Sequence, residues 1–274
     1  MRIAITGGNG KMGSNLIPYL LEQNHTVVSI DRTPLANYTR EVDSIVADIS
    51  DFGQVVASIQ GCEALIHLAA IPWPLGHPAH VVYGNNTLSS FNALNAASML
   101  GIKRVCLASS INAIGGAFSR SPNYDYFPLD EQHLTYAEDS YSLSKWVMEQ
   151  QADAFARRYE WMSIASLRLH MLTNTREEAL ELTAGMGEYA ARHLWAYTLQ
   201  KEASRACLLS LTADFAGHEV FYITAPHSAT SQPSMELAHQ NYPKTEIRGD
   251  FSNHSSFFNC AKAERILGWK HQEN

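Results

Sequence analysis

The sequence has no long hydrophobic run and little charge, and each shortage excludes a class of protein. No window of about 18 apolar residues occurs, so no segment is predicted to span a membrane. A strand-like run begins at Arg2, which predicts that there is no signal peptide and that the protein is cytoplasmic. The formal net charge of -7 argues against nucleic acid or an anionic membrane surface as a partner.

Cysteine and metal-binding motifs are scarce as well. The 4 cysteines show no Cys-x-x-Cys spacing, which is typical of reduced core thiols rather than of a disulfide framework. No His-Glu-x-x-His motif or cysteine–histidine cluster occurs, so no metal site is predicted. With 274 residues and 46% hydrophobic content, the chain can form one large α/β domain, alone or with a small appendage.

The N-terminal stretch has the pattern of a strand, a glycine turn, a helix and a second strand. Gly7 permits a tight turn, Gly10 permits close approach of a pyrophosphate, and Gly13 lets the helix pack near the sheet. Unpaired N–H groups at the start of the helix would face the phosphates. The pattern predicts a dinucleotide-binding turn, with a glycine-rich turn that binds no ligand as the alternative. Strands are predicted over residues 2–5 and 26–30, with the helix over 16–21.

Asp31 ends the second strand and decides which coenzyme is predicted. Its carboxylate can accept hydrogen bonds from both ribose hydroxyls and would repel a 2′-phosphate, which favours NAD over NADP. Lys11 and Arg32 lie nearby in the sequence and leave NADP as the less favoured alternative. Asp48, after the third strand, is expected to meet the adenine amino group, while Asp51 caps the next helix.

The middle of the chain continues the alternation of strand and helix. A buried strand over residues 64–70 ends in small side chains, which leave room for a cofactor at the edge of the sheet. The proline-rich loop 71–78 is expected to form a wall of the substrate site or, alternatively, a packed surface loop. A long helix over 80–100 follows. Adjacent Asn85 and Asn86 within it predict either a side-chain role or a local bulge.

A serine, a tyrosine and a lysine in the next segment predict proton-transfer chemistry. Ser110 ends the fifth strand, and the helix that opens at Asp139 carries Tyr141 and Lys145 four residues apart, on one face. The ammonium of Lys145 is expected to lower the pKa of the phenol, so that Tyr141 can exchange a proton near neutral pH. Ser110 would hold the substrate oxygen. The same spacing also suits a surface Tyr–Lys pair, but the glycine turn upstream favours catalysis.

Beyond Arg168 the alternation becomes less regular. The whole pattern predicts a Rossmann-type, doubly wound parallel sheet in residues 1–168, followed by a small mixed α/β substrate-binding appendage in residues 169–274 with some return to the sheet. The predicted elements of the second part are helices over 176–183 and 260–267, a helix that ends at Leu211, and strands over 193–198 and 219–224.

These motifs together resemble the extended short-chain dehydrogenase/reductase superfamily, in particular its NAD-dependent epimerase/dehydratase group. They follow the order of that family through nearly the whole chain: Thr6-Gly7-x2-Gly10-x2-Gly13, Asp48-Ile49, His67-Leu68-Ala69-Ala70, Asn86, Ser109-Ser110 with Gly115, Tyr141-x3-Lys145, Arg168 and Lys262-Ala263-x3-Leu267-Gly268-Trp269.

The resemblance implies a role for each matching residue. Tyr141 would be the general acid/base, Lys145 would bind the nicotinamide ribose, and Ser110 would orient the substrate. Asn86 would support its helix and a proton-relay water. The residues implied at the substrate are Ser110, Asn112, Tyr141 and Arg192, and those implied at the cofactor are Gly7, Gly10, Lys11, Met12, Gly13, Asp31, Arg32, Asp48, Ile49, Leu68, Ala69, Ala70, Tyr141 and Lys145.

Within the family, the chain is similar in size to the uronate dehydrogenases. Arg192 falls where both these enzymes and sugar-nucleotide epimerases place an anion-binding arginine, which would hold a carboxylate or a phosphate; a solvated arginine is the alternative. Ile111 and Asn112 replace the polar pairs of uronate dehydrogenases and dehydratases, which disfavours a dehydratase. His170 replaces a common asparagine, which weakens the case for a sugar nucleotide.

The sequence therefore predicts an NAD-dependent oxidoreductase acting on a hydroxyl or carbonyl carbon of a free sugar or sugar acid. A UDP-sugar 4-epimerase with retained NAD and a non-catalytic NAD-binding regulator are the alternatives. The resemblance also implies a homodimer, formed by the helices that carry Asn86 and Tyr141.

Overall fold

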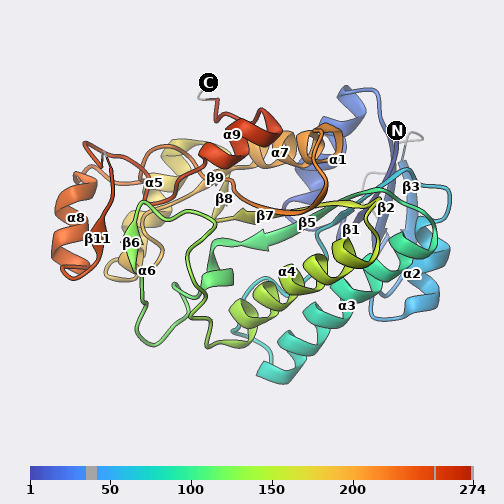
Figure 1. The fold of residues 1–274 in the computed structure, drawn as a ribbon, viewed down its shortest axis with the longest axis horizontal. Helices are drawn as coiled ribbons and strands as arrows, with labels where there is room; N and C mark the ends of the chain where they lie inside the picture. The colour runs from blue at the N-terminus through green and yellow to red at the C-terminus, as the bar shows by residue number, and fades with distance from the viewer. Residues whose placement is uncertain (35–41, 250, 273–274) are drawn as a thin grey trace.

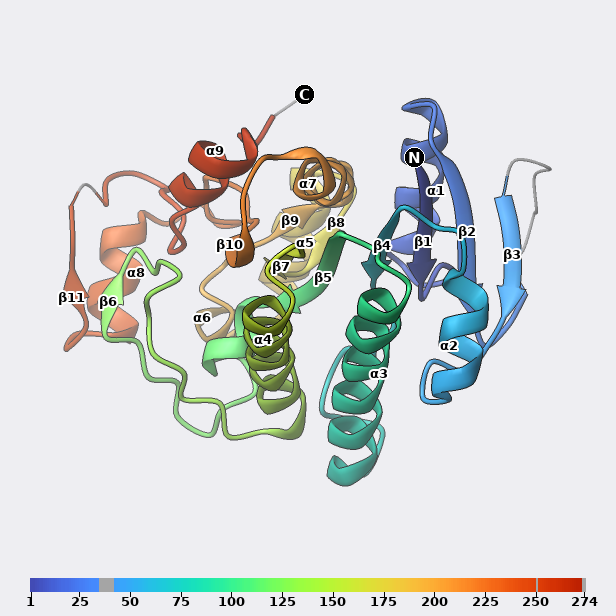
Figure 2. The ribbon, with the colours of Figure 1, turned by 45° about the vertical axis from the view of Figure 1, so that its right-hand side comes forward.

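A seven-stranded parallel sheet forms the centre of the computed structural model, which describes residues 1–34, 42–249 and 251–272. The strand order is β10-β7-β5-β4-β1-β2-β3, and each neighbouring pair is parallel. Figure 1 labels β1, β2, β3, β5 and β7 of this sheet, and Figure 2 labels β10 and β4 as well. This order confirms the predicted Rossmann-type sheet. The strands of the sheet are β1 (Arg2–Thr6), β2 (Thr26–Asp31), β3 (Val42–Val46), β4 (Ala64–His67), β5 (Arg104–Ser110), β7 (Ser163–Leu169) and β10 (Gly217–Tyr222).

Helices cover both faces of the sheet, as Figure 2 shows. One face packs against α1 (Gly13–Glu22), α7 (Gln200–Thr212) and α9 (Ala261–Leu267). The other packs against α2 (Phe52–Ile59), α3 (Ala79–Met99) and α4 (Ser140–Arg158). The strands alternate between the two layers: Ile3 and Ile5 belong to the first hydrophobic cluster, whereas Ala4 belongs to the second. All three side chains are fully buried, which explains the continuous apolar run in the sequence.

Short polar residues begin the helices that matter for the site. The Asp139 carboxylate accepts hydrogen bonds from the backbone N–H groups of Tyr141 and Ser142, and so fixes the first turn of α4. The Asp51 carboxylate accepts from Gln54 N at the start of α2, as predicted. These caps orient the helices relative to the carboxyl edge of the sheet, where the predicted site residues gather.

The segment after β7 supplies α7, β10 and α9 to the main sheet and its helix layers, and several elements outside them. The helix α7 packs on α1, and the strand β10 extends the sheet beside β7. A separate hydrophobic cluster lies beyond the end of the sheet. The domain boundary expected at residue 168 stays a prediction. The remaining elements are the 3-10 helix η1 (Ile111–Ile114), β6 (Tyr126–Phe127), β8 (Leu172–Thr173), α5 (Arg176–Gly185), α6 (Tyr189–Arg192), β9 (Thr198–Leu199), α8 (Ser234–Asn241) and β11 (Glu246–Ile247).

Two predicted elements differ in the structure. The strand expected over residues 193–198 is wrong, because Leu194 and Trp195 have positive φ angles of 52° and 48° and form a turn after α6. Only Thr198–Leu199 of this stretch is extended. The bulge considered at Asn85 and Asn86 is absent from α3, which the structure describes as one continuous helix.

Candidate functional site

A cleft of about 410 Å³ lies at the carboxyl edge of the sheet, where a Rossmann fold binds its ligands. The glycine turn forms one side of the cleft, and Ser110, Tyr141 and Lys145 form another. A smaller hollow of about 170 Å³ continues past the glycine turn, between Asp31 and Asp48. Every residue predicted to bind the cofactor lines one of these two hollows.

The glycine turn leaves no room for side chains at two of its positions. Gly7 has a φ of +75°, and a Cβ there would lie 2.8 Å from the backbone nitrogen of Ala69. A Cβ on Gly13 would lie 2.3 Å from the carbonyl oxygen of Gly8. The turn is therefore packed tightly against the end of β4 and against itself, which holds its backbone open toward the cleft.

Two carboxylates border the smaller hollow. The Asp31 carboxylate accepts hydrogen bonds from Asn9 N, at 3.1 Å, and from Arg32 N, at 2.7 Å. The Asp48 carboxylate accepts from the backbone and the hydroxyl of Ser50, and these hydrogen bonds lower its pKa. Both groups offer acceptor oxygens, in positions that suit a ribose diol and an adenine amino group.

Tyr141 lies at the start of α4 with its ring 7% exposed. Burial raises the pKa of Tyr141 to about 12, although the hydrogen bond with the Ser110 hydroxyl opposes this effect. This pKa differs from the expectation that Lys145 brings it close to neutrality, because desolvation is the larger effect. At neutral pH the phenol holds its proton and can donate it.

Lys145 is buried one turn further along α4. Its ammonium donates to the carbonyl oxygen of Ala108 at 2.6 Å and lies 5.8 Å from the centre of the Tyr141 ring. Burial lowers the pKa of Lys145 to about 8, while the carboxylate of Glu149 opposes this shift. The lysine thus remains mostly charged at neutral pH and is fixed between β5 and the tyrosine.

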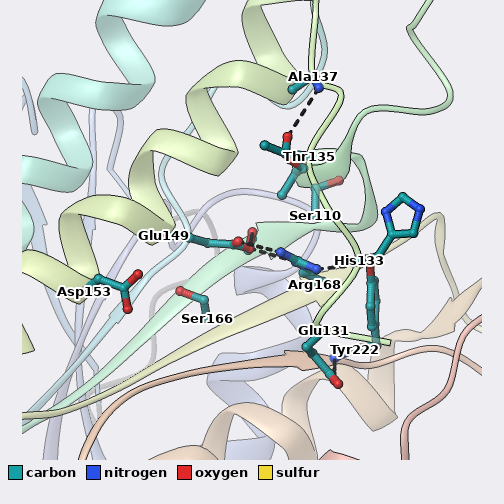
Figure 3. Close-up of polar contacts among 12 residues, drawn as sticks. Ser110, Glu131, His133, Thr135, Ala137, Glu149, Asp153, Ser166, Arg168 and Tyr222 are labelled. Carbon is teal, nitrogen blue, oxygen red and sulfur yellow. Dashed lines mark hydrogen bonds and ion pairs between the residues drawn. The ribbon is translucent and has the colours of Figure 1, made fainter. Parts of the chain in front are cut away.

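A buried ion pair involves Glu149, which lies one turn after Lys145 on α4. The Arg168 guanidinium donates to both oxygens of Glu149, at 3.0 and 2.8 Å, and to the Tyr222 hydroxyl at 3.1 Å (Figure 3). The hydroxyl of Ser109 donates to Glu149 at 2.6 Å. This network joins α4 to β5, β7 and β10. Arg168 therefore has a structural role in it.

Asn86 joins three segments and does not line the cleft. Its amide nitrogen donates to the carbonyl of Ile71 and to the Ser144 hydroxyl, both at 3.0 Å, and its amide oxygen accepts from Ile71 N. The residue therefore connects α3 to α4 and to the start of the proline-rich loop 71–78. The structure gives Asn86 a positioning role, and its part in a proton relay stays a prediction.

The loop between β5 and α4 contributes one predicted and one unpredicted group. Asn112 donates from its backbone and its side chain to the Ser110 hydroxyl, at 3.1 and 3.4 Å, and so orients the serine. Phe118 was not identified from the sequence. Its ring is edge-on to both neighbours, with ring centres 5.9 Å from Tyr141 and 6.3 Å from His193. Phe118 lines the cleft between these two residues.

The predicted anion-binding arginine does not line the cleft. The Arg192 guanidinium donates to the backbone carbonyls of Ser119 and Arg120, at 2.8 and 3.4 Å, and lies over the ring of Tyr189. In this arrangement Arg192 holds the loop after β5, which corrects its expected place at the substrate. The next residue, His193, lines the cleft instead.

His193 and His170 form a stacked pair, of which the sequence singles out His170 alone. The nitrogens His193 Nδ1 and His170 Nε2 lie 3.1 Å apart, and the ring centres lie 5.0 Å apart. His170 follows the end of β7, at the carboxyl edge of the sheet. His193 gave no such signal, because a turn in the left-handed region aims it into the cleft.

A chain of serine, histidine and aspartate also occurs away from the cleft. The Ser166 hydroxyl lies 2.8 Å from His218 Nε2, and His218 Nδ1 lies 2.7 Å from the Asp153 carboxylate. Ser166, which Figure 3 shows beside Asp153, is completely buried. A nucleophile must meet its substrate, so this chain connects α4, β7 and β10 rather than performing acyl transfer.

Among the described residues, no group of three or more histidine, cysteine or carboxylate side chains could hold a metal ion. No helix in the described part of the chain is both long and apolar enough to cross a membrane.

Comparison with known proteins adds to this geometry. The model of the NAD dependent epimerase/dehydratase family matches residues 3–179. Over 142 residues the chain is 32% identical to a putative dihydroflavonol 4-reductase of Synechocystis, covering 50% of this chain and 41% of that protein. It is 31% identical over 163 residues to a putative UDP-glucose 4-epimerase of Methanocaldococcus jannaschii, covering 57% of this chain and 52% of that protein.

The chain thus spans about half the length of these curated relatives. Among solved structures, a mutated uronate dehydrogenase superposes with a TM-score of 0.73 at 20% identity, covering 100% of this chain and 82% of the other. At this level of identity the likeness shows the fold.

Proposed function

The chain belongs to the NAD-dependent epimerase/dehydratase family, and from this we propose that it is an NAD-dependent oxidoreductase acting on a small sugar-like substrate. Hydride would pass between NAD and a carbon that bears a hydroxyl or carbonyl group. One observation carries the proposal: Ser110, Tyr141 and Lys145 meet in one cleft that continues into the glycine turn.

The residues of both hollows fit a dinucleotide. The turn at Gly7, Gly10 and Gly13 presents backbone to a pyrophosphate, and the Asp31 carboxylate would accept from the adenosine ribose. Asp48 would accept from the adenine amino group. When bound, NAD supplies the carbon that accepts or returns the hydride.

The chain's own residues would donate and accept the proton. In reduction, the Tyr141 phenol would donate its proton to the carbonyl oxygen of the substrate while Ser110 holds that oxygen in line. In oxidation, Tyr141 would accept the hydroxyl proton as phenolate, and the Ser110 hydrogen bond and the nearby Lys145 charge both favour that form. Lys145 would also donate to the ribose next to the nicotinamide.

We expect Asp31→Ala to weaken NAD binding by about 10- to 100-fold, since two hydrogen bonds to a charged acceptor are lost. Affinity for NADP should fall less or should rise, because the repulsion of the 2′-phosphate disappears and Arg32 remains nearby. Titration calorimetry with both coenzymes measures the change. Asp43→Ala is the matched control, because Asp43 pairs with Arg2 on the surface and lines neither hollow. Equal losses of affinity for NAD and NADP would show that Asp31 does not distinguish the two coenzymes at the ribose.

The proposed function is tested by NADH formation with NAD and a panel of free aldoses, uronic acids and UDP-sugars. Steady NADH formation on a free substrate is the expected result. Interconversion of UDP-sugars without net NADH would favour the second candidate, a UDP-sugar 4-epimerase with retained NAD, which the Methanocaldococcus relative supports. Tight NAD binding without either activity would favour a regulator.

We also propose a homodimer formed by α3 and α4. The two helices pack against each other, and Leu88 and Phe91 on α3 remain 47% and 44% exposed. Exposed apolar side chains that gather on one helix are typical of a protein interface.

A Leu88→Glu/Phe91→Glu variant is therefore expected to convert a dimer into a monomer, because two charges would be buried in the contact. Light scattering after size-exclusion chromatography measures the mass. Leu182→Glu on α5, where the leucine is 43% exposed, is the control and should leave the mass unchanged. A wild-type protein that elutes as a monomer at all concentrations would contradict the proposal.

A further inference from the structure

The cleft contains a polar group that the proposed function does not yet use, the His170–His193 pair. Both rings line the cleft, and a hydrogen-bond distance of 3.1 Å joins them. The backbone nitrogen of His170 donates to the Thr198 hydroxyl, which in turn donates to the Ile223 carbonyl. These bonds fix the backbone of His170, which is buried. His193 is the more exposed member of the pair.

Phe118 separates the histidine pair from the proposed catalytic tyrosine. Phe118 contacts Tyr141 on one side and His193 on the other, so a substrate ring above Phe118 would face the phenol and the imidazole together. Pro72, Trp73 and Met186 complete this half of the cleft with apolar surface. Apolar and aromatic walls with a few convergent polar groups are typical of a site for a small, largely uncharged molecule.

The charges around the cleft favour the same class of substrate. Among the described residues that line it, only Lys11 and Lys145 are cationic, and neither a carboxylate nor an arginine is present. Lys11 belongs to the glycine turn, Lys145 is bonded to Ala108, and Arg192 is bonded to backbone carbonyls away from the cleft. No described side chain of the substrate half is therefore a ready partner for a carboxylate or a diphosphate.

The two histidines do not supply that positive charge. Burial lowers the pKa of both imidazoles, and the neighbouring ring lowers the pKa of His170 further. An uncharged pair shares one hydrogen between its facing nitrogens, which leaves one donor and one acceptor at the outer nitrogens. A hydroxyl can donate to or accept from such a group, whereas a carboxylate would be desolvated without a counter-charge.

We propose that His193, held by His170, binds a hydroxyl of an uncharged polyhydroxy substrate and so selects neutral sugars over sugar acids and sugar nucleotides. This inference rests on the proposed function and narrows its substrate class. His193 is a specificity-determining residue, and His170 is a positioning residue behind it.

The test compares matched pairs of substrates that differ in charge: glucose with glucuronate, and galactose with galacturonate. Each is assayed with saturating NAD for kcat and KM. In the wild type, kcat/KM is expected to be at least about 10-fold higher for the neutral member of a pair, since the acid must be desolvated without a partner. His193→Ala should raise KM for the neutral sugar about 10-fold with little change in kcat, as loss of one hydrogen bond in a desolvated site would do.

Two further variants separate recognition from a structural effect. His193→Gln keeps a neutral amide and should recover most of the lost KM, whereas His193→Lys should shift the preference toward the acid of each pair. His239→Gln replaces an exposed histidine on α8 and should leave every constant unchanged. The NAD affinity of all variants should match that of the wild type.

Two results overturn the inference in distinguishable ways. A wild-type enzyme that forms NADH faster from the uronates contradicts the inference alone, as does a His193→Ala variant with unchanged KM. A protein that binds NAD and forms no NADH from any of the four sugars contradicts the proposed function, and the inference with it.

Discussion

Replacing Tyr141 by phenylalanine is expected to lower kcat by about 10³-fold, because loss of a positioned acid or base typically costs two to four powers of ten. The change removes one oxygen from a ring that is 7% exposed and that contacts Phe118 edge-on. Packing should therefore persist, and NAD affinity should stay within about 3-fold of the wild type, since the glycine turn, Asp31 and Lys145 are intact. Steady-state NADH formation and calorimetry measure both quantities.

Tyr136→Phe is the matched control for this prediction. The Tyr136 hydroxyl donates to the Asp125 carboxylate at 3.1 Å, on an exposed loop, and does not line the cleft. Its removal should leave kcat unchanged. A Tyr141→Phe enzyme that retained a tenth or more of the wild-type kcat would remove Tyr141 from the proton transfer.

Replacing Arg168 by methionine is expected to lower the free energy of unfolding by about 3–5 kcal/mol, the usual cost of leaving one buried charge without its partner. Arg168 is 5% exposed and Glu149 2%, and the two form a bidentate pair with distances of 3.0 and 2.8 Å. Since a domain is typically stable by only about 5–15 kcal/mol, the effect should be large in urea denaturation. Activity should fall as well, because Ser109 and Lys145 flank the orphaned carboxylate.

Two comparisons interpret this loss of stability. The double variant Arg168→Met/Glu149→Gln should recover more than half of it, because the buried charge is gone. Arg2→Met breaks a surface pair with Asp43, whose side chains are 41% and 53% exposed, and should cost less than about 1 kcal/mol. If Arg168→Met costs no more than Arg2→Met, the buried pair does not stabilise the fold.

The N-terminal half of the fold could be predicted from the sequence because its signals are local. Apolar runs that are buried on both faces mark β1 and β2, and Gly7 and Gly13 between them leave no room for a side chain. Tyr141 and Lys145 share a helix face through their spacing alone, and Asp139 marks where that helix begins. Such features need no knowledge of distant parts of the chain.

The substrate half of the cleft could not be predicted, because it depends on contacts between distant segments. Two residues with positive φ, Leu194 and Trp195, interrupt a stretch whose composition favours a strand. That turn directs His193 toward His170, which is 23 residues away in sequence, while Arg192 turns to the loop after β5. Neither spacing nor hydrophobic pattern contains this information.

The pKa of Tyr141 differs from the expectation for a related reason. The spacing in α4 correctly places a lysine beside the phenol, but the sequence does not show how completely both are buried. Desolvation raises the pKa of Tyr141 to about 12 and lowers that of Lys145 to about 8, because burial disfavours the charged form of each group. At neutral pH the phenol is protonated and the lysine is still mostly charged.

The most direct test of the central claim is a single-turnover measurement of NADH absorbance. Wild-type protein and the Tyr141→Phe variant, each loaded with NAD to equal occupancy, are mixed rapidly with the substrates of the panel. We expect a rise in NADH within one turnover in the wild type and a rise about 10³-fold slower in the variant. No rise in the fully loaded wild type, or an equal rise in both proteins, would contradict hydride transfer governed by Tyr141 in this cleft.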